Sequence, residues 1–189
     1  MPPNNAHFVV GVQCQPTDCP SVGKDRQVAT DFSSTMRFPA NLATVWAMLR
    51  SESYLQAKCA DSSDPTYSVI DQPQGCTITV QRTLTEDLPA IAKNLVGDHV
   101  TLLEVQSWAT DINGITGDFT ICVPNAPITV TAVAQLRAEE DSCVMNITGT
   151  ISVAVPLFSG IAESFMREQM TEVLAREHAI GMTWLAEHS

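Results

Sequence analysis

The sequence predicts an α+β domain in which one antiparallel sheet of about seven strands curves around a long C-terminal helix. Three observations support this fold class. Apolar and polar residues alternate in successive segments between positions 28 and 153, which is the period of strands with one buried face. From Gly160 to Ala186 apolar residues recur every three to five positions, which is the period of a helix. A chain of 189 residues is also long enough for one domain with a substantial core.

The first predicted strand follows an N-terminal leader. Residues 1–27 contain four prolines and no sustained periodicity, so we expect an extended or disordered leader, with the folded domain spanning 28–189. The strand is predicted over 28–38 and ends at Pro39, which cannot donate a backbone hydrogen bond.

Two short helices are predicted next. Asn41 is a suitable N-cap for a helix over 42–49, where apolar residues have helical spacing. A second helix is predicted over 51–58, and the polar residues 61–65 predict a turn.

The middle of the chain is predicted to be almost entirely β-structure. Residues 67–71 and 76–84 form the arms of a hairpin around a turn at 72–75. A short helical insert is expected at 88–97, between Pro89 in its first turn and Gly97 at its end. Four more strands are predicted over 100–108, 119–123, 128–136 and 143–153.

Composition and motifs exclude several functions. The chain has 10 Lys and Arg against 21 Asp and Glu, and a net charge of −11 opposes binding to nucleic acid. No apolar run is long enough to span a membrane and no signal peptide is evident, so we expect a cytoplasmic protein. Only Cys14 and Cys19 among the six cysteines are close together, and no zinc-ligand spacing or phosphate-binding glycine loop occurs. We therefore expect no metal and no cofactor.

Two charged residues stand out on apolar strand faces. Arg82 alternates with Cys76, Ile78 and Val80, and Glu104 shares a face with apolar residues of the next strand. Because a buried charge needs a partner, the two side chains either point inward, pairing with each other or holding a polar group of a ligand, or lie at strand ends and reach water. Both alternatives remain open from the sequence.

The order of elements resembles the helix-grip fold of the START-like, polyketide cyclase-like (SRPBCC) superfamily over about residues 28–188. Within it, short motifs look like an actinobacterial family of unknown function. These motifs are Val45-Trp46 with Tyr54-Leu55, Leu88-Pro89 with Gly97-Asp98, Glu104 with Trp108, and 156–163.

The resemblance implies an apolar cavity between the sheet and the long helix that binds lipids, sterols or polyketide-like molecules. Our first hypothesis is therefore binding or carriage of a small hydrophobic ligand, with no catalysis evident. The alternative is an enzyme of cyclase or dehydratase type, in which Arg82 polarises a carbonyl and Glu104 or Glu163 moves a proton, with the pKa of the buried carboxylate raised. An interaction module or a homodimer is a third hypothesis. The expected ligand-binding residues are Arg82, Glu104, Trp108, Met145, Phe165, Met166, Met170, Val173 and Trp184.

Overall fold

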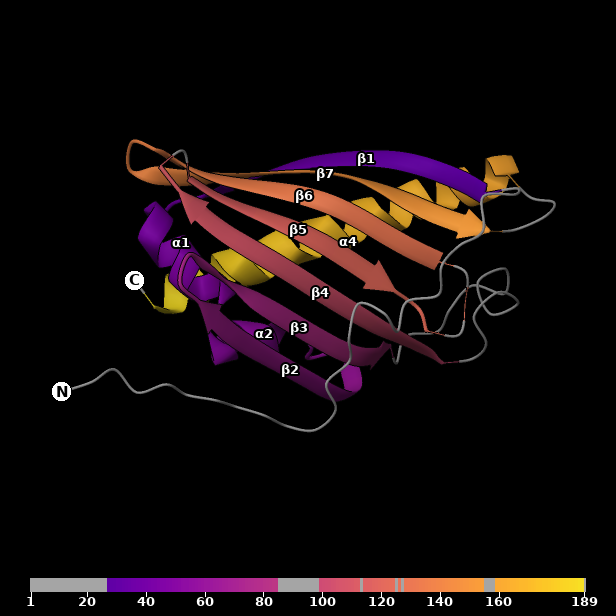
Figure 1. The fold of residues 1–189 in the computed structure, drawn as a ribbon, viewed down its shortest axis with the longest axis horizontal. Coiled ribbons are helices and arrows are strands. Elements are labelled where there is room, and N and C mark those ends of the chain that lie inside the picture. The colour runs from indigo at the N-terminus through magenta and orange to yellow at the C-terminus, as the bar shows by residue number, and fades with distance from the viewer. Residues whose placement is uncertain are drawn as a thin grey trace.

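One curved antiparallel sheet and a long helix form the frame of the molecule (Figure 1). The computed structural model describes residues 27–84, 99–112, 114–124, 126, 128–154 and 159–188. The predicted leader and the predicted helical insert at 88–97 lie outside the described residues. The elements are β1 (Gln27–Phe38), α1 (Leu42–Leu49), α2 (Glu52–Lys58), β2 (Ser62–Gln72), β3 (Gly75–Leu84), β4 (Val100–Asp111), β5 (Gly114–Cys122), β6 (Ile128–Glu139), β7 (Ser142–Ala154) and α4 (Ser159–Glu187).

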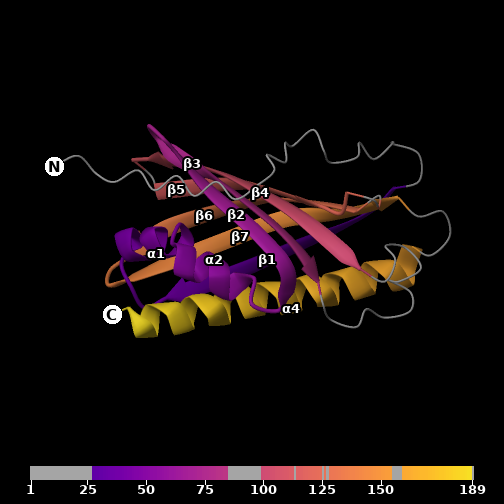
Figure 2. The same ribbon diagram turned by 90° about the horizontal axis from the view of Figure 1, so that it is seen from below.

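The strands lie in the order β1-β7-β6-β5-β4-β3-β2, and each adjacent pair is antiparallel. Helix α4 runs along one face of the sheet, with α1 and α2 near its C-terminal end (Figure 2). The sheet therefore has an inner face, which faces α4, and an outer face. This arrangement is the α+β helix-grip fold that the sequence predicts.

Local side-chain capping explains where the two short helices begin. The Asn41 side chain accepts a hydrogen bond from the Thr44 backbone N–H at 2.9 Å, and α1 has the bounds that the sequence predicts. The Ser51 hydroxyl accepts from the Tyr54 backbone N–H at 3.2 Å, so Ser51 is the cap of α2 and the helix itself begins at Glu52.

Helix α4 approaches the other elements closely at Gly181. A Cβ atom there would lie 2.9 Å from a ring carbon of Phe38 in β1 and 3.2 Å from the terminal methyl of Met48 in α1. Only a glycine lets the backbone of α4 lie this close to Phe38 and Met48. The C-terminal half of α4 is thereby packed on the core, where Leu185 is also buried.

Strands β2 and β5 begin several residues before the positions that the sequence predicts. Strand β2 begins at Ser62, so the predicted turn at 61–65 is wrong. Pro65 is tolerated there because β2 is an edge strand and its pairing with β3 is irregular between Ser63 and Thr66. Strand β5 begins at Gly114 rather than at Phe119, because Gly114 pairs with β4 and Gly117 pairs with both β4 and β6.

The outer face combines exposed hydroxyl side chains with one small apolar cluster. Thr131 and Thr148 are exposed on it, as the alternation predicts. Leu103, Val105 and Cys122 are nevertheless buried there.

The described cysteines are in two states. Cys122 is disulfide-bonded, whereas the buried cysteines 59, 76 and 143 are free.

The described helices include none that is both long and apolar enough to cross a membrane.

We predict that Gly117→Ala destabilises the protein by about 2 kcal/mol, because a Cβ atom at this position would lie 2.5–2.8 Å from the indole ring of Trp108 and force it to move. Chemical denaturation measures the change. Thr116→Ala, at the exposed neighbouring position, is the control and should cost less than about 1 kcal/mol. Equal costs for the two variants would contradict the prediction.

Candidate functional site

A cavity of about 330 Å³ lies between the inner face of the sheet and α4. Its walls are mostly apolar and come from all seven strands of the sheet, from α1 and α2, and from the long helix. The principal apolar residues are Phe32 and Met36 of β1, Phe119 and Ile121 of β5, Val130 and Ala132 of β6, Met145 and Ile147 of β7, and Met170, Val173, Leu174 and Ile180 of α4.

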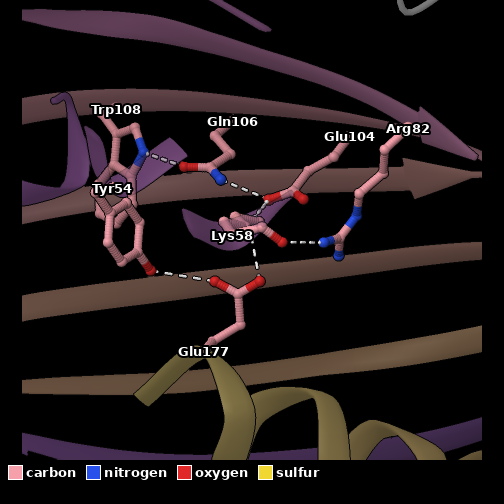
Figure 3. A network of polar contacts seen from close by, with 7 residues as sticks. All are labelled: Tyr54, Lys58, Arg82, Glu104, Gln106, Trp108 and Glu177. Carbon is pink, nitrogen blue, oxygen red and sulfur yellow. Dashed lines mark hydrogen bonds and ion pairs between the residues drawn. The ribbon is translucent and has the colours of Figure 1, made fainter. Parts of the chain in front are cut away.

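Seven further residues give one part of this cavity a polar lining, and we call them the polar cluster (Figure 3). They come from α2, β3, β4 and α4, so residues far apart in the sequence meet here. The polar cluster consists of Tyr54, Lys58, Arg82, Glu104, Gln106, Trp108 and Glu177.

The inner face of β4 starts a chain of hydrogen bonds. Trp108 Nε1 donates to Gln106 Oε1 at 2.8 Å, and Gln106 Nε2 donates to Glu104 Oε1. The three residues alternate along one strand, so their side chains point to the same face. Val80 of β3 lies opposite Glu104, which places the carboxylate on the same inner face as Arg82.

Lys58 connects this chain to α4. Its ammonium nitrogen lies 2.8 Å from Glu104 Oε1 and 3.2 Å from Glu177 Oε1. The hydroxyl of Tyr54, one helical turn before Lys58 in α2, donates to Glu177 Oε2 at 3.1 Å. Lys58 therefore bridges a carboxylate of the sheet and a carboxylate of the helix.

The charges of the central pair stabilise each other. Lys58 and Glu104 are each only 5% exposed. Burial acts to lower the pKa of Lys58, but the nearby carboxylates Glu104 and Glu177 outweigh it and the pKa is raised. Burial acts to raise the pKa of Glu104, but Lys58 and the Gln106 hydrogen bond outweigh it and the pKa is lowered. Both groups are therefore charged at neutral pH.

For Glu104, this result corrects the expectation of a raised carboxylate pKa in the cavity. That expectation considered burial alone, and no pattern in the sequence placed Lys58 beside Glu104. The side chain of Glu163, the other candidate, lies outside the described residues. The pKa of Tyr54 is raised, by burial and by the negative charge of Glu177, so its hydroxyl remains a protonated donor at neutral pH.

Arg82 and Glu104 both line the cavity but form no ion pair with each other within the described part of the chain. Arg82 Nη1 instead donates to the backbone carbonyl of Lys58 at 2.6 Å, at the end of α2. Figure 3 shows the guanidinium beside this carbonyl, with Glu104 directed to the Lys58 ammonium. Glu104 does not reach water at a strand end, because it lies in the middle of β4, is only 5% exposed and pairs with Lys58.

The other expected ligand-binding residues are placed differently from one another. Trp108, Met145, Met170 and Val173 line the cavity. Trp184 does not, because its indole faces α2, where Nε1 donates to Ser53 Oγ at 2.7 Å. The side chains of two expected residues, Phe165 and Met166, lie outside the described residues.

Sequence reasoning missed four members of the polar cluster. Gln106 had a usable signal, since it alternates with Glu104 and Trp108 on a strand that is otherwise apolar on that side. Tyr54 and Lys58 are four residues apart and share a helix face, but an isolated lysine normally indicates a solvated face. Glu177 could not be identified as a site residue from the sequence, because it lies on a helix with many other charged residues.

No group of three or more metal-ligating side chains occurs within residues 27–84, 99–112, 114–124, 126, 128–154 and 159–188.

We predict strong energetic coupling between Lys58 and Glu104. Lys58→Met should cost about 3–5 kcal/mol, because it leaves a buried carboxylate without its main partner. The double variant Lys58→Met/Glu104→Gln should cost at least about 1 kcal/mol less than the sum of the single variants. The exposed pair of Arg37 and Glu139, 65% and 49% exposed, is the control, with coupling below about 1 kcal/mol. Additive costs in urea denaturation at the buried pair would contradict this prediction.

We also predict a pH dependence for the contribution of Glu104. Its pKa in the folded protein lies below the ordinary value of 4.5, so the folded state binds this proton less readily than the unfolded state. The stability advantage of the wild type over Glu104→Gln is then complete above about pH 4.5 and is lost as the pH falls through the folded-state pKa. Denaturation of both proteins between about pH 7 and 3 measures the difference, and a pH-independent difference would be evidence against an ionised Glu104.

Comparisons with known proteins agree with this architecture. A family model described as "Protein of unknown function (DUF2505)" matches residues 33–185. The search of curated proteins found no match.

Three solved structures share the fold at low sequence identity. The structure of TTHA0849 from Thermus thermophilus is 16% identical, with a TM-score of 0.56 over 84% of this chain and 99% of that chain. Norcoclaurine synthase from Thalictrum flavum in complex with dopamine and hydroxybenzaldehyde is 10% identical, with a TM-score of 0.54 over 96% and 97%. The di-domain ARO/CYC StfQ from the steffimycin biosynthetic pathway is 9% identical, with a TM-score of 0.59 over 85% of this chain and 52% of that chain.

At these identities the similarity concerns the fold alone. The family model, in contrast, covers most of the chain. The protein therefore belongs to the DUF2505 family of proteins of unknown function and has the helix-grip fold that these solved structures share.

Proposed function

We propose that the protein binds a small and largely apolar molecule in the cavity between the sheet and α4. The observation that carries this proposal is a cavity with apolar walls and one polar part, which is the usual composition of a small-molecule site. The apolar walls would supply most of the binding free energy, and the polar cluster would orient the ligand. Carriage or sensing of such a molecule requires no reaction in the cavity.

The cavity volume limits the size of the ligand. A dry protein cavity of roughly 150 Å³ accommodates benzene, which has six non-hydrogen atoms. By the same ratio, a cavity of about 330 Å³ would accommodate roughly a dozen non-hydrogen atoms. A medium-chain lipid or a molecule with two fused rings fits this limit, whereas a complete sterol exceeds it.

The cavity borders solvent between α4 and the start of β2. Val173 lines the cavity and is 42% exposed. Arg176 of α4 and Asp61, which precedes β2, form an exposed ion pair that also lines it. A ligand could therefore enter at this edge without disturbing the buried pair of Lys58 and Glu104.

An enzyme of cyclase or dehydratase type is the second candidate. The observation that favours it is the convergence of Tyr54, Lys58, Glu104 and Glu177 within hydrogen-bond distance inside the cavity. The shifted pKa values of Lys58 and Glu104 oppose it, because both groups are held in their charged forms, away from the range in which a general acid or base works at neutral pH. Binding without chemistry therefore ranks first.

We predict that filling the cavity abolishes binding without unfolding the protein. Ala132→Leu adds apolar volume on the inner face of β6, so apolar ligands should bind at least about tenfold more weakly to this variant. Ala138→Leu, at an exposed position of the same strand, is the matched control and should bind like the wild type. Native mass spectrometry of the protein purified from its own cells gives the mass of a co-purified molecule, and titration with that molecule compares the variants.

Two outcomes would count against this function. Equal binding to wild type and Ala132→Leu would place the ligand elsewhere. Conversion of the co-purified molecule during incubation with the protein would replace the binding proposal with the enzyme.

A further inference from the structure

We propose that the ligand carries a carboxylate and that Arg82 binds it. This inference rests on the proposed function, since it concerns the same cavity, and it names the chemical class of the ligand. Arg82 lines the cavity from the inner face of β3, next to the apolar residues Leu84 and Leu102. A molecule with an apolar body and a carboxylate end would match both parts of this wall.

The hydrogen bonds within the polar cluster leave Arg82 as its principal unused donor. Trp108 and Tyr54 each have one donor hydrogen, and both are used, on Gln106 and Glu177. Lys58 has three donor hydrogens, and two carboxylates lie within reach of its ammonium group. Arg82 has five, and within the described residues its guanidinium makes one hydrogen bond, to the Lys58 carbonyl.

Arg82 presents unused N–H groups at an apolar wall of the cavity, so it favours a ligand that carries a hydrogen-bond acceptor. Its planar donors match the two oxygens of a carboxylate, and charge-assisted pairs of this kind are stronger than neutral hydrogen bonds. The net charge of the chain is −11, so long-range attraction does not bring an anion to the protein. Selection for a carboxylate must therefore come from the local contact with Arg82.

A cationic ligand is disfavoured by the same geometry. Of the carboxylates that line the cavity, Asp61 is already paired with Arg176. The other two are Glu104 and Glu177, and Lys58 Nζ lies 2.8 Å and 3.2 Å from them. A second cation on either carboxylate would lie close to the Lys58 ammonium in a site of low exposure. The repulsion between them would offset the attraction.

The test compares three probes with the same ten-carbon chain: decanoate, decanol and decylamine. Each has about a dozen non-hydrogen atoms, within the size limit derived above. Isothermal titration at pH 7.5 should show that decanoate binds the wild type about ten- to a hundredfold more tightly than decanol, which corresponds to one charge-assisted contact. Decylamine should bind more weakly than decanol.

Two arginine variants assign the contact. Arg82→Gln should reduce the preference for decanoate over decanol to less than about threefold, and Arg82→Lys should retain part of it. Arg137→Gln removes the same charge on the outer face of β6 and should keep the full preference. If Arg82→Gln does not fold, the wild-type preference and Arg82→Lys still decide the matter.

The outcomes separate this inference from the proposed function. Equal binding of decanoate and decanol to the wild type, or the same preference in wild type and Arg82→Gln, would overturn the carboxylate contact while the cavity remained a binding site. Binding of decylamine to the wild type more tightly than decanoate would also overturn the carboxylate contact while the cavity remained a binding site. Both proposals would be overturned if none of the three probes bound the wild type and if the co-purified molecule bound wild type and Ala132→Leu equally well.

Discussion

The ion pair of Lys58 and Glu104 is the constraint on which the site depends. It places two opposite charges in the interior, where each is only 5% exposed and the attraction of the other offsets the cost of burial. Through Glu177 the same ammonium also holds α4. The sheet, the short helix α2 and the long helix therefore meet at one nitrogen atom, and the polar part of the cavity is organised around it.

A buried ion pair of this kind contributes more to the positions of the side chains around the cavity than to the stability of the fold. Replacement of a buried ion pair by apolar residues is often neutral or stabilising, so stability alone does not explain its presence. Its geometry has a clear effect on the cavity, because Lys58 uses the carboxylates of the sheet and the helix while the Lys58 carbonyl orients Arg82. Lys58 thereby pairs with two carboxylates through its ammonium group and fixes the Arg82 guanidinium through its carbonyl oxygen.

The fold was accessible from the sequence because its elements have distinct periods. Alternation gave the strands, Asn41 gave the start of α1, and helical spacing gave α4. The site was accessible only in part. Glu104 and Arg82 stood out because they break an apolar pattern on strands, whereas Lys58 and Glu177 lie on helices, where charged residues are usual. Their meeting depends on how α2 lies against α4, and no local pattern in either segment records that contact. Similarly, the early start of β5 was not predicted, because the close approach of Gly114 to β6 and of Gly117 to Trp108 is a tertiary feature.

The fluorescence of Trp108 offers a way to observe the cavity wall directly, because its indole ring lines the cavity. Its indole is held edge-on between Trp46 and Phe119, with ring centroids 5.6 Å and 5.2 Å away, and a glycine lies beneath it. Trp46 and Trp184 are not among the residues that line the cavity. A tryptophan in contact with the cavity senses a change of polarity there, so the fluorescence of Trp108 would report a bound molecule without an attached dye.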